Sequence, residues 1–403
     1  MHQRTWLSLL TLPLVAGFTY PMVVPRLPQA KVEGGKASQD PLAGLADIQD
    51  VLTYVRDNYV DPVDMNKVLA GGVRGALERA HPLNAFLTAE DLRLPDPGPG
   101  SLGIRVLRRG IYASVLSVLP GSPAAKAGLL AGDVIRKVDG TPVAELNQPL
   151  LERRLRGPVG SSVTLLRYAV ATGETRSLTL SRAAMAAPAV TLRREAGVVV
   201  AELPDLADGR TEELRAQIQP ADARSVLLLD LRRCHGGTVA EAGRLAASLG
   251  LKGGLGVLQE PGKSDEELRL PPMEPLGLTR VASLSGFGTA GAAELVVSAL
   301  KKEGRTTYGD RSVALGVKLV RLPLRQGGAV ELVQQRWQAV GGERLDRQGV
   351  LPETQLRGLR PEDDPVPRVI ELIQKGTSPK ASLLTPPGLR PKETSPRPWP
   401  ELA

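Results

Sequence analysis

The chain has 403 residues, more than one ordinary domain needs, and this length predicts two or three domains. Its formal net charge is +8, but aromatic residues make up only 3% of the chain and no basic stripe is interleaved with them, so no nucleic-acid partner is expected. One cysteine, Cys234, excludes an internal disulfide, and three histidines leave too few ligands for a His/Cys zinc site, so neither a metal nor another cofactor is expected.

The N-terminal residues 1–30 have the order of a signal peptide or an N-terminal anchor. Arg4 is followed by an apolar stretch from Trp6 to Phe18 that Pro13 interrupts. This stretch has signal-peptide length, and the lack of a clear A-x-A site leaves an uncleaved anchor open. We therefore expect export to the periplasm or cell envelope, with a membrane tether as the open alternative.

A polar, glycine-containing linker is expected at 31–45, before the folded part of the chain. Amphipathic spacing then predicts helices at 46–56 and 65–80, and Thr88 suits the N-cap of another short helix. We expect residues 46–93 to form a small helical bundle with a packing role.

Residues 98–183 contain strand-like runs at 111–118 and 134–138 with a short helix between them. Ser122 suits the N-cap of that helix and Gly128 its end. The order of these elements resembles a PDZ domain of the kind found in bacterial proteases. The resemblance is carried by "SLGI" (101–104), "PGSPAAKAGLLAGDVIRKVDGTPV" (120–143) and "LRGPVGSSVTLLR" (155–167). Residues 98–183 are called the PDZ segment below.

The PDZ resemblance implies a binding site for the C-termini of proteins or peptides. In such domains a peptide adds as a β-strand, and backbone N–H groups of one loop hold its terminal carboxylate. The loop here consists of Ser101, Leu102, Gly103 and Ile104, and its apolar side chains suit a nonpolar last residue. Ser101 stands where family members more often carry glycine.

Apolar strands alternate with helices in residues 190–375. The strands include "GVVVAEL", "SVLLLDLR" and "RVASLSG", and the helices include "RTEELRAQIQ", "TVAEAGRLAASLG" and "AGAAELVVSALKKEG". This alternation predicts an α/β domain with parallel strands and crossover helices. The tail at 376–403 is rich in proline and serine, which predicts disorder.

Over residues 46–375 the chain resembles the C-terminal processing peptidases, which are serine peptidases with a Ser–Lys dyad. The resemblance rests on several motifs in order: "VRDNYVDPVD" (55–64), the PDZ residues above, "LLLDLRRCHGG" (227–237), "GTAGAAELVVSALKKEGR" (288–305), "RQGVLPETQL" and "RPEDDPVPRVIELI". It implies a multidomain α+β and α/β fold with an N-terminal helical segment, a PDZ domain and an α/β peptidase-like core.

The same resemblance aligns the two catalytic positions of the family with residues that have neither a hydroxyl nor an amine. Aligned on Glu294, the nucleophile position falls on Gly291, and the lysine position falls on Leu315. Glu294 matches the acid that supports the dyad, or is only a charge in the first turn of its helix. Gly236 and Gly237 belong to the loop whose N–H groups stabilise the oxyanion.

Neighbouring groups offer two substitutes for the lost dyad. Ser285 and Thr289 carry hydroxyls near the glycine turn at 286–291, called the elbow below, but a hydroxyl without a base is a weak nucleophile. Lys318 lies three residues after Leu315, on the opposite face of an extended strand, so a bulge would be needed to bring its amine back.

Cys234 and His235 form the other candidate pair. Adjacent side chains usually point apart, and a lone cysteine is more often a small buried apolar side chain. We therefore favour a loop role for these two residues over a Cys–His nucleophile.

We favour a peptidase-like protein that binds protein C-termini and has lost, or strongly reduced, its peptidase activity. The alternative is an active serine endopeptidase that cleaves near protein C-termini with a relocated Ser/Thr–Lys dyad. A third interpretation is a structural envelope protein with an unused PDZ loop. Gly291 is the reason why we prefer the first interpretation to an active peptidase, because glycine has no side chain with which to attack a carbonyl.

Overall fold

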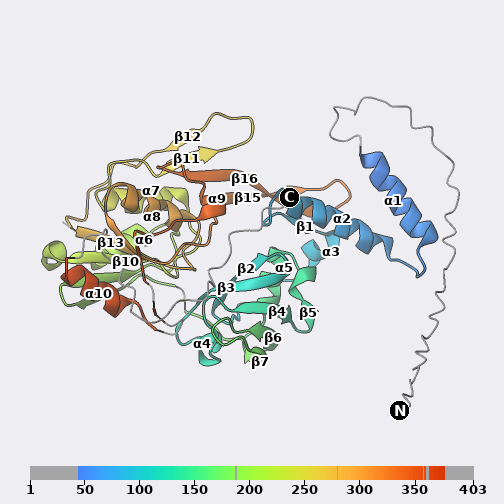
Figure 1. Cartoon of the computed structure of the whole chain (residues 1–403), viewed down its shortest axis with the longest axis horizontal. Helices are drawn as coiled ribbons and strands as arrows, with labels where there is room; N and C mark the ends of the chain where they lie inside the picture. The colour runs from blue at the N-terminus through green and yellow to red at the C-terminus, as the bar shows by residue number, and fades with distance from the viewer. Residues whose placement is uncertain (1–43, 187, 279, 357, 360–362, 377–403) are drawn as a thin grey trace, which may run out of the picture. The chain divides into compact units, whose positions relative to one another are not determined.

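The computed structural model describes residues 44–186, 188–278, 280–356, 358–359 and 363–376 (Figure 1). The expected signal peptide or anchor, nearly all of the expected linker, and the expected tail beyond Gly376 lie outside these residues. Within them, no helix is both long enough and apolar enough to cross a bilayer. The chain divides into two compact units, residues 1–65 and 66–403.

The two N-terminal helices, α1 (Leu45–Asn58) and α2 (Met65–Ala80), follow the predicted amphipathic spacing. Neither helix contains a buried residue. Because α1 and nearly all of α2 belong to different units, the expected helical bundle stays a prediction. Apolar side chains of α1 such as Ile48 and Val51 remain more than half exposed.

A short strand and a capped helix follow α2. Strand β1 (Ala85–Leu87) pairs antiparallel with β16 (Ala329–Ala339). Helix α3 (Ala89–Arg93) begins at the predicted N-cap, because Thr88 Oγ1 accepts the Asp91 N–H and the Asp91 carboxylate accepts the Thr88 N–H.

The PDZ segment forms one antiparallel sheet with its own apolar core. The strand order is β2-β3-β4-β6-β7, with β5 pairing with β4. Helix α4 begins as predicted, since Ser122 Oγ accepts the Ala125 N–H. The elements are β2 (Ile104–Arg109), β3 (Tyr112–Val118), α4 (Pro123–Lys126), β4 (Val134–Val138), β5 (Thr141–Pro142), η1 (Val143–Glu145), α5 (Gln148–Leu155), β6 (Ser162–Tyr168) and β7 (Thr175–Ser181).

The core contains the predicted parallel sheet. Its strand order is β17-β14-β13-β10-β9-β8, parallel from β17 to β9 and antiparallel between β9 and β8. The strands are β8 (Thr191–Glu195), β9 (Val198–Glu202), β10 (Val226–Asp230), β13 (Arg280–Ser285), β14 (Thr306–Gly309) and β17 (Thr354–Gln355). The helices around it are α6 (Arg210–Gln217), α7 (Val239–Ser248), α8 (Ala292–Lys302), α9 (Leu345–Gln348) and α10 (Val366–Gln374), with the 3-10 turn η2 (Pro220–Arg224) before β10.

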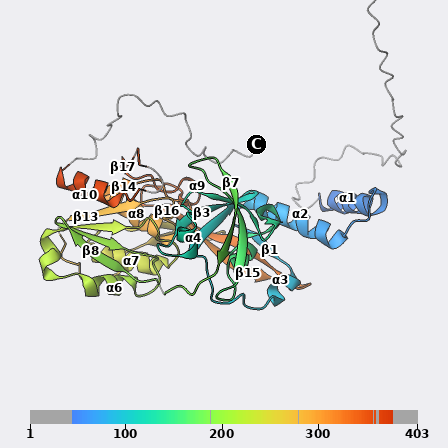
Figure 2. The same ribbon diagram turned by 90° about the horizontal axis from the view of Figure 1, so that it is seen from below.

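Both faces of the parallel sheet are buried, which explains its continuous apolar strands. On β10, Leu227 and Leu229 pack in the cluster that contains α7 and α8, whereas Leu228 packs with Val369 and Ile370 of α10. Figure 2 shows α10 on one side of these strands and α6 and α7 on the other.

A second sheet in the core was not predicted from the sequence. It contains β11 (Gly256–Gln259), β12 (Glu266–Leu268), β15 (Val317–Pro323) and β16, and β1 adds to it from the N-terminal segment. Asn84 strengthens this connection, because its side-chain oxygen accepts the Val333 N–H at 2.8 Å. Together with the parallel sheet, it gives the mixed α/β architecture that we expected for the chain.

Candidate functional site

The elbow connects the carboxyl end of β13 to the start of α8, and it has the backbone of a strained turn. Gly291 adopts φ +65° and ψ −124°, a conformation that L side chains rarely accept. A Cβ added there would meet Leu315 O at 3.8 Å and Trp337 at 3.9 Å, which are ordinary contacts. The position therefore has room for a side chain but carries none.

The two hydroxyls near Gly291 are buried and serve the turn itself. Ser285 Oγ donates to Asp310 O at 3.0 Å. Thr289 Oγ1 donates to Leu231 O at 2.8 Å and accepts the Gly286 N–H at 2.9 Å. Because both hydroxyls are buried and donate their protons to backbone carbonyls, neither is arranged as a nucleophile.

Glu294 is fully buried and joins the elbow to the loop that contains Leu315. Its Oε2 accepts the N–H groups of Gly291 at 2.9 Å and Leu315 at 2.8 Å. Its Oε1 accepts the Ala314 N–H at 2.9 Å and the Ser312 hydroxyl. The idea that Glu294 is only a charge in the first helical turn is therefore wrong, since such a charge would face solvent.

Burial is the main influence on the Glu294 carboxyl and raises its pKa to about 7. The Ser312 hydroxyl and the three backbone N–H groups act in the opposite direction, because they stabilise the carboxylate. Burial thus disfavours the carboxylate of Glu294, while the four donors that join the elbow and the loop favour it.

Leu315 lies beside Gly291, because its carbonyl oxygen is the nearest atom to a Cβ placed on the glycine. Its side chain belongs to an apolar cluster rather than to a polar cleft. We call this cluster the PDZ–elbow seam; it contains Leu83, Leu107, Leu116, Phe287, Ala290, Val313 and Leu315. The two positions aligned with the dyad therefore meet in space, and an apolar side chain occupies the second.

Neither Lys318, the lysine considered as a substitute, nor Lys301 of α8 lies beside Gly291. Lys318 is exposed on β15, where its backbone pairs with Gln335. The pKa of nearby Glu260 is lowered mainly by its hydrogen bond with Lys263, and the charge of Lys318 adds to this effect. The β15 bulge follows Lys318 and does not turn it toward Leu315. Lys301, near the end of α8, donates from Nζ to Leu351 O at 2.9 Å.

The loop of Gly236 and Gly237 follows β10, next to the elbow. The Cys234 carbonyl accepts the Ala290 N–H at 3.0 Å, which connects the two turns. Both glycines have positive φ, +78° and +95°, and a Cβ on Gly237 would overlap the backbone of Leu206. The loop therefore requires glycine at 237, and its backbone lies where the carboxyl ends of parallel strands gather.

Cys234 and His235 do not form a nucleophile pair. Cys234 is fully buried in the core, and burial strongly raises the pKa of its thiol. His235 Nδ1 lies 2.8 Å from Arg233 O, and burial, assisted by the charge of Arg105, lowers the pKa of the imidazole to about 4. A neutral thiol and a weakly basic imidazole favour the loop role that we expected.

The expected carboxylate loop of the PDZ segment lies between the Ser101 bridge to Ala183 and strand β2. Leu102 is 1% exposed and packs into the PDZ core, so this residue offers only its backbone to a ligand. Gly103 has φ +72°, and its N–H is bonded to Ser101 Oγ at 3.1 Å. Ile104 begins β2 and is half-buried against the same core.

The PDZ segment also contacts the elbow directly, through residues that sequence reasoning missed. The Arg109 guanidinium lies 5.6 Å from the centre of the Phe287 ring and donates to Val313 O at 2.9 Å. A Cβ on Gly288 would approach Leu116 O to 2.9 Å, so strand β3 lies against the elbow. The one available signal was Phe287, an aromatic residue within a glycine turn in a chain with three phenylalanines.

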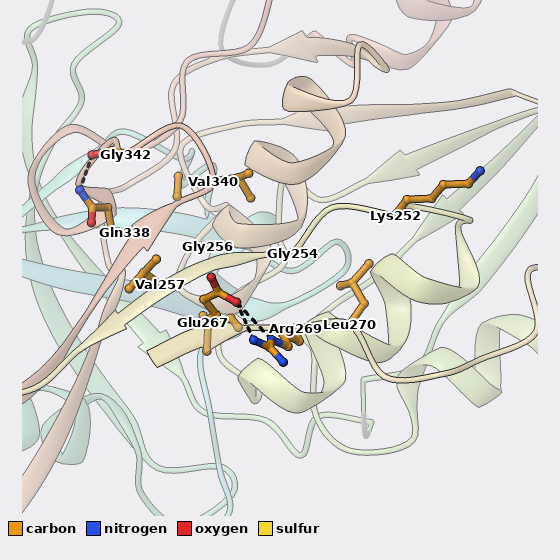
Figure 3. A pocket seen from close by; sticks show the side chains of 12 residues that line it. Lys252, Gly254, Gly256, Val257, Glu267, Arg269, Leu270, Gln338, Val340 and Gly342 are labelled. Atoms are coloured by element: carbon orange, nitrogen blue, oxygen red, sulfur yellow. Dashed lines mark hydrogen bonds and ion pairs between the residues drawn. The ribbon is translucent and has the colours of Figure 1, made fainter. Parts of the chain in front are cut away.

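A hollow of about 590 Å³ lies between β11, β12 and the end of β16 (Figure 3). Lys252, Glu267, Arg269 and Gln338 contribute to its wall, and Glu267 and Arg269 pair with each other at 3.0 Å. None of the expected site residues lines this hollow among the described residues, so it is separate from the elbow.

Comparison with known proteins identifies two regions. Residues 114–166 match the PDZ domain family, and residues 198–356 match peptidase family S41. The chain is 27% identical to a carboxy-terminal-processing protease of Bartonella bacilliformis over 332 residues, which cover 79% of this chain and 76% of the relative. It is 24% identical to a probable CtpA-like serine protease of Staphylococcus aureus, covering 77% of this chain and 64% of that protein, which is less than two thirds of its length.

A solved structure supports the fold. The photosystem II D1 C-terminal processing protease superposes with a TM-score of 0.64 over 78% of this chain and 87% of that one, at 24% sequence identity. The arrangement of the PDZ segment and the peptidase-like core is thus shared with a processing protease.

Proposed function

Because the chain belongs to peptidase family S41 and contains a PDZ domain, we propose that it is an exported protein that binds protein C-termini through its PDZ segment, with peptidase activity lost or strongly impaired. The observation that carries the proposal is the pair of residues at the centre of the elbow. Gly291 and Leu315 lie side by side in a correctly shaped turn, yet they supply neither a hydroxyl nor an amine.

The chemistry of a Ser–Lys peptidase requires both groups. A hydroxyl oxygen attacks the peptide carbonyl, an uncharged amine takes its proton, and backbone N–H groups stabilise the oxyanion. Gly291 has no atom that can form the bond to the carbonyl carbon. Leu315 has no atom that can accept the proton, and its side chain packs into the PDZ–elbow seam.

The relocated-dyad alternative receives no support from the described residues. Ser285 and Thr289 donate their hydroxyl protons to backbone carbonyls. Lys318 lies on an exposed strand near Glu260. A working dyad would need a hydroxyl and an amine within hydrogen-bond reach of each other.

Binding of C-termini is supported by the PDZ segment. Strand β2 lies at an edge of its sheet, beside α5, which is where a peptide strand can add. The Ser101–Ile104 loop precedes this strand, so a terminal carboxylate at the loop would be followed by peptide backbone along β2.

The test combines binding and cleavage in one sample. Purified protein is incubated with an unfolded substrate that ends in an apolar residue, and with the same substrate amidated at its C-terminus. We expect binding of the free acid, weaker binding of the amide, and no cleavage of either. Equal binding of acid and amide would contradict the carboxylate loop, and cleavage abolished by replacing Ser285, Thr289 or Lys318 would establish the alternative.

Export is proposed from the sequence of residues 1–30 alone. A reporter enzyme that works only outside the cytoplasm, joined after Leu45, tests this part. We expect activity with the native N-terminus and none when residues 6–18 are deleted. Full activity of a reporter that works only in the cytoplasm would show that the protein stays inside.

A further inference from the structure

The edge of the PDZ sheet where a peptide would add is not vacant. Strand β2 is the terminal strand in the order β2-β3-β4-β6-β7, so among the described residues no strand pairs with its outer side. That side faces α5, and the labels β2 and α5 lie next to each other in Figure 1. An open strand edge presents backbone N–H and C=O groups that require partners.

The side chain of Gln148, the first residue of α5, supplies these partners. Its Nε2 donates to Val106 O at 2.9 Å, and its Oε1 accepts the Arg108 N–H at 2.7 Å. A peptide strand added antiparallel to β2 would offer the same two kinds of group, the N–H of one residue and the C=O of a residue two positions away. The primary amide of Gln148 thus makes the hydrogen bonds that the backbone of a ligand would make.

The orientation of this amide follows from its partners. Val106 O only accepts and the Arg108 N–H only donates, so the nitrogen must face the former and the oxygen the latter. Nε2 also donates to Glu152 Oε1 at 2.6 Å, one turn along α5. The start of the helix is fixed by Asn147, which caps α5 by accepting the Leu150 N–H and donates to Phe86 O.

Ser101 acts in the same way at the carboxylate loop. Its Oγ accepts the Gly103 N–H at 3.1 Å, and this N–H is one of the groups expected to hold a terminal carboxylate. Two side chains therefore occupy three backbone groups of the carboxylate loop and β2: Gly103 N–H, Val106 O and Arg108 N–H.

We infer that Gln148 and Ser101 cap the peptide-binding edge of the PDZ segment, so that a C-terminal peptide has to displace both side chains in order to bind. This inference rests on the proposed function, since it concerns the ligand site of the same segment. Gln148 and Ser101 would then determine the affinity for the peptide, because each new backbone hydrogen bond to β2 only replaces an existing one. The net free energy of binding would come from the terminal carboxylate and the last side chain of the peptide.

Binding measured by calorimetry tests the inference with a short free-acid peptide ending in leucine. Gln148→Ala should tighten binding by about tenfold. In this variant the peptide gains hydrogen bonds to Val106 O and the Arg108 N–H without first breaking the bonds that these groups make to Gln148. Ser101→Gly should tighten it by about threefold for the single bond at Gly103. Arg153→Ala is the matched control, since it shortens another long side chain of α5 that makes no hydrogen bond to β2 in the described residues, and it should bind like the wild type.

Unchanged or weaker binding by Gln148→Ala, with measurable wild-type binding, would overturn the cap and leave the proposed function standing. If no variant binds the peptide, the proposed function fails, and hydrogen exchange at the Arg108 amide then decides on the cap. Faster exchange in Gln148→Ala than in the wild type and in Arg153→Ala supports the cap, and equal exchange overturns it.

Discussion

At the scale of single residues, the carboxyl group of Glu294 connects two backbone segments from a buried position. It is fully buried, and it accepts hydrogen bonds from both the elbow and the Leu315 loop. In a peptidase this acid would support the dyad. Here the same contacts hold two backbone segments in register. If the reacting groups are lost, as we propose, these contacts preserve the shape of the site without its chemistry.

The raised pKa of Glu294 predicts a pH-dependent stability. The ordinary pKa of a glutamate is 4.5, and the pKa of Glu294 in the folded protein is about 7. At pH values between these two, the folded protein binds more protons at Glu294 than the unfolded chain does. The free energy of unfolding therefore falls as the pH rises through this range. The change across this window is about 3 kcal/mol. Glu294→Gln removes this titration and destabilises the fold, because an amide nitrogen cannot accept the N–H groups. We expect the stability gap between wild type and variant to shrink from pH 4.5 to 7.

Urea unfolding followed by tryptophan fluorescence measures the gap, and taking the difference between the two proteins cancels the other titrating groups. Glu90→Gln, which removes an exposed carboxylate, serves as the control and should show a constant, small difference. Parallel pH profiles of wild type and Glu294→Gln would contradict the raised pKa.

The elbow itself predicts how activity can be restored. Gly291→Ser has room for its side chain, yet it should remain inactive because the hydroxyl still lacks a base. Gly291→Ser combined with Leu315→Lys should cleave an unfolded substrate slowly, provided that Gly236 and Gly237 stabilise the oxyanion. Mass spectrometry of the substrate detects cleavage, and a serine-directed acylating reagent should label residue 291 only in the double variant. Cleavage by Gly291→Ser alone would show that another base serves the site.

At the scale of elements, close backbone packing around the elbow predicts a large effect from one methyl group. A Cβ on Gly288 would overlap Arg232 O and approach Leu116 O to 2.9 Å, and both are backbone atoms that cannot rotate away. We expect Gly288→Ala to lower the free energy of unfolding by about 2 kcal/mol. Gly75→Ala in α2, where a Cβ meets nothing within 4 Å, should be neutral or slightly stabilising. Chemical unfolding compares the two, and equal effects would contradict the tight contact.

The elements that the sequence predicted well are those with strong local patterns. Strand β10 begins with a run of four apolar residues, β13 alternates apolar residues with small serines, and α4 carries its cap, proline and terminal glycine. The second sheet escaped prediction because β15 and β16 mix polar and apolar residues on both faces, and because β16 pairs with β1 across more than two hundred residues of sequence. The apolar stripe of α1 predicted a helix correctly, but a stripe alone does not specify what the helix packs against.

For the site, ordered motifs were enough to align Gly291 and Leu315 with the family pattern. The contact of Arg109 with Val313 joins residues that are 204 positions apart, and no local pattern encodes it. The burial of Glu294 was also hidden, because a glutamate in the first turn of a helix usually faces water. Its four donors come from the elbow and from a loop whose position depends on the whole core.

At the scale of the whole molecule, the PDZ–elbow seam joins the PDZ segment to the peptidase-like core at the place where catalysis would occur in a relative. Leu315 contributes an apolar side chain to the seam. If it stands at the lysine position of the family, as we propose, the exchange adds apolar contact between the two domains besides removing a base. The two domains should consequently unfold together.

Arg109 provides the test of this coupling. Its guanidinium stacks on Phe287 and donates to Val313 O, and burial lowers its pKa while the nearby Glu294 acts in the opposite direction. Arg109→Ala should weaken the coupling by about 2 kcal/mol, from one cation–π contact and one hydrogen bond. Calorimetry should then resolve a PDZ transition and a core transition where the wild type shows one.

Arg136→Ala is the matched control for this experiment. Arg136 also stacks on aromatic rings, those of Tyr112 and Tyr168, but all three residues belong to the PDZ sheet. Its loss should destabilise the PDZ segment by a similar amount without separating the transitions, because the seam is untouched. If Arg109→Ala melts in a single transition like the wild type, the seam does not couple the domains, and the apolar side chain of Leu315 contributes to local packing alone.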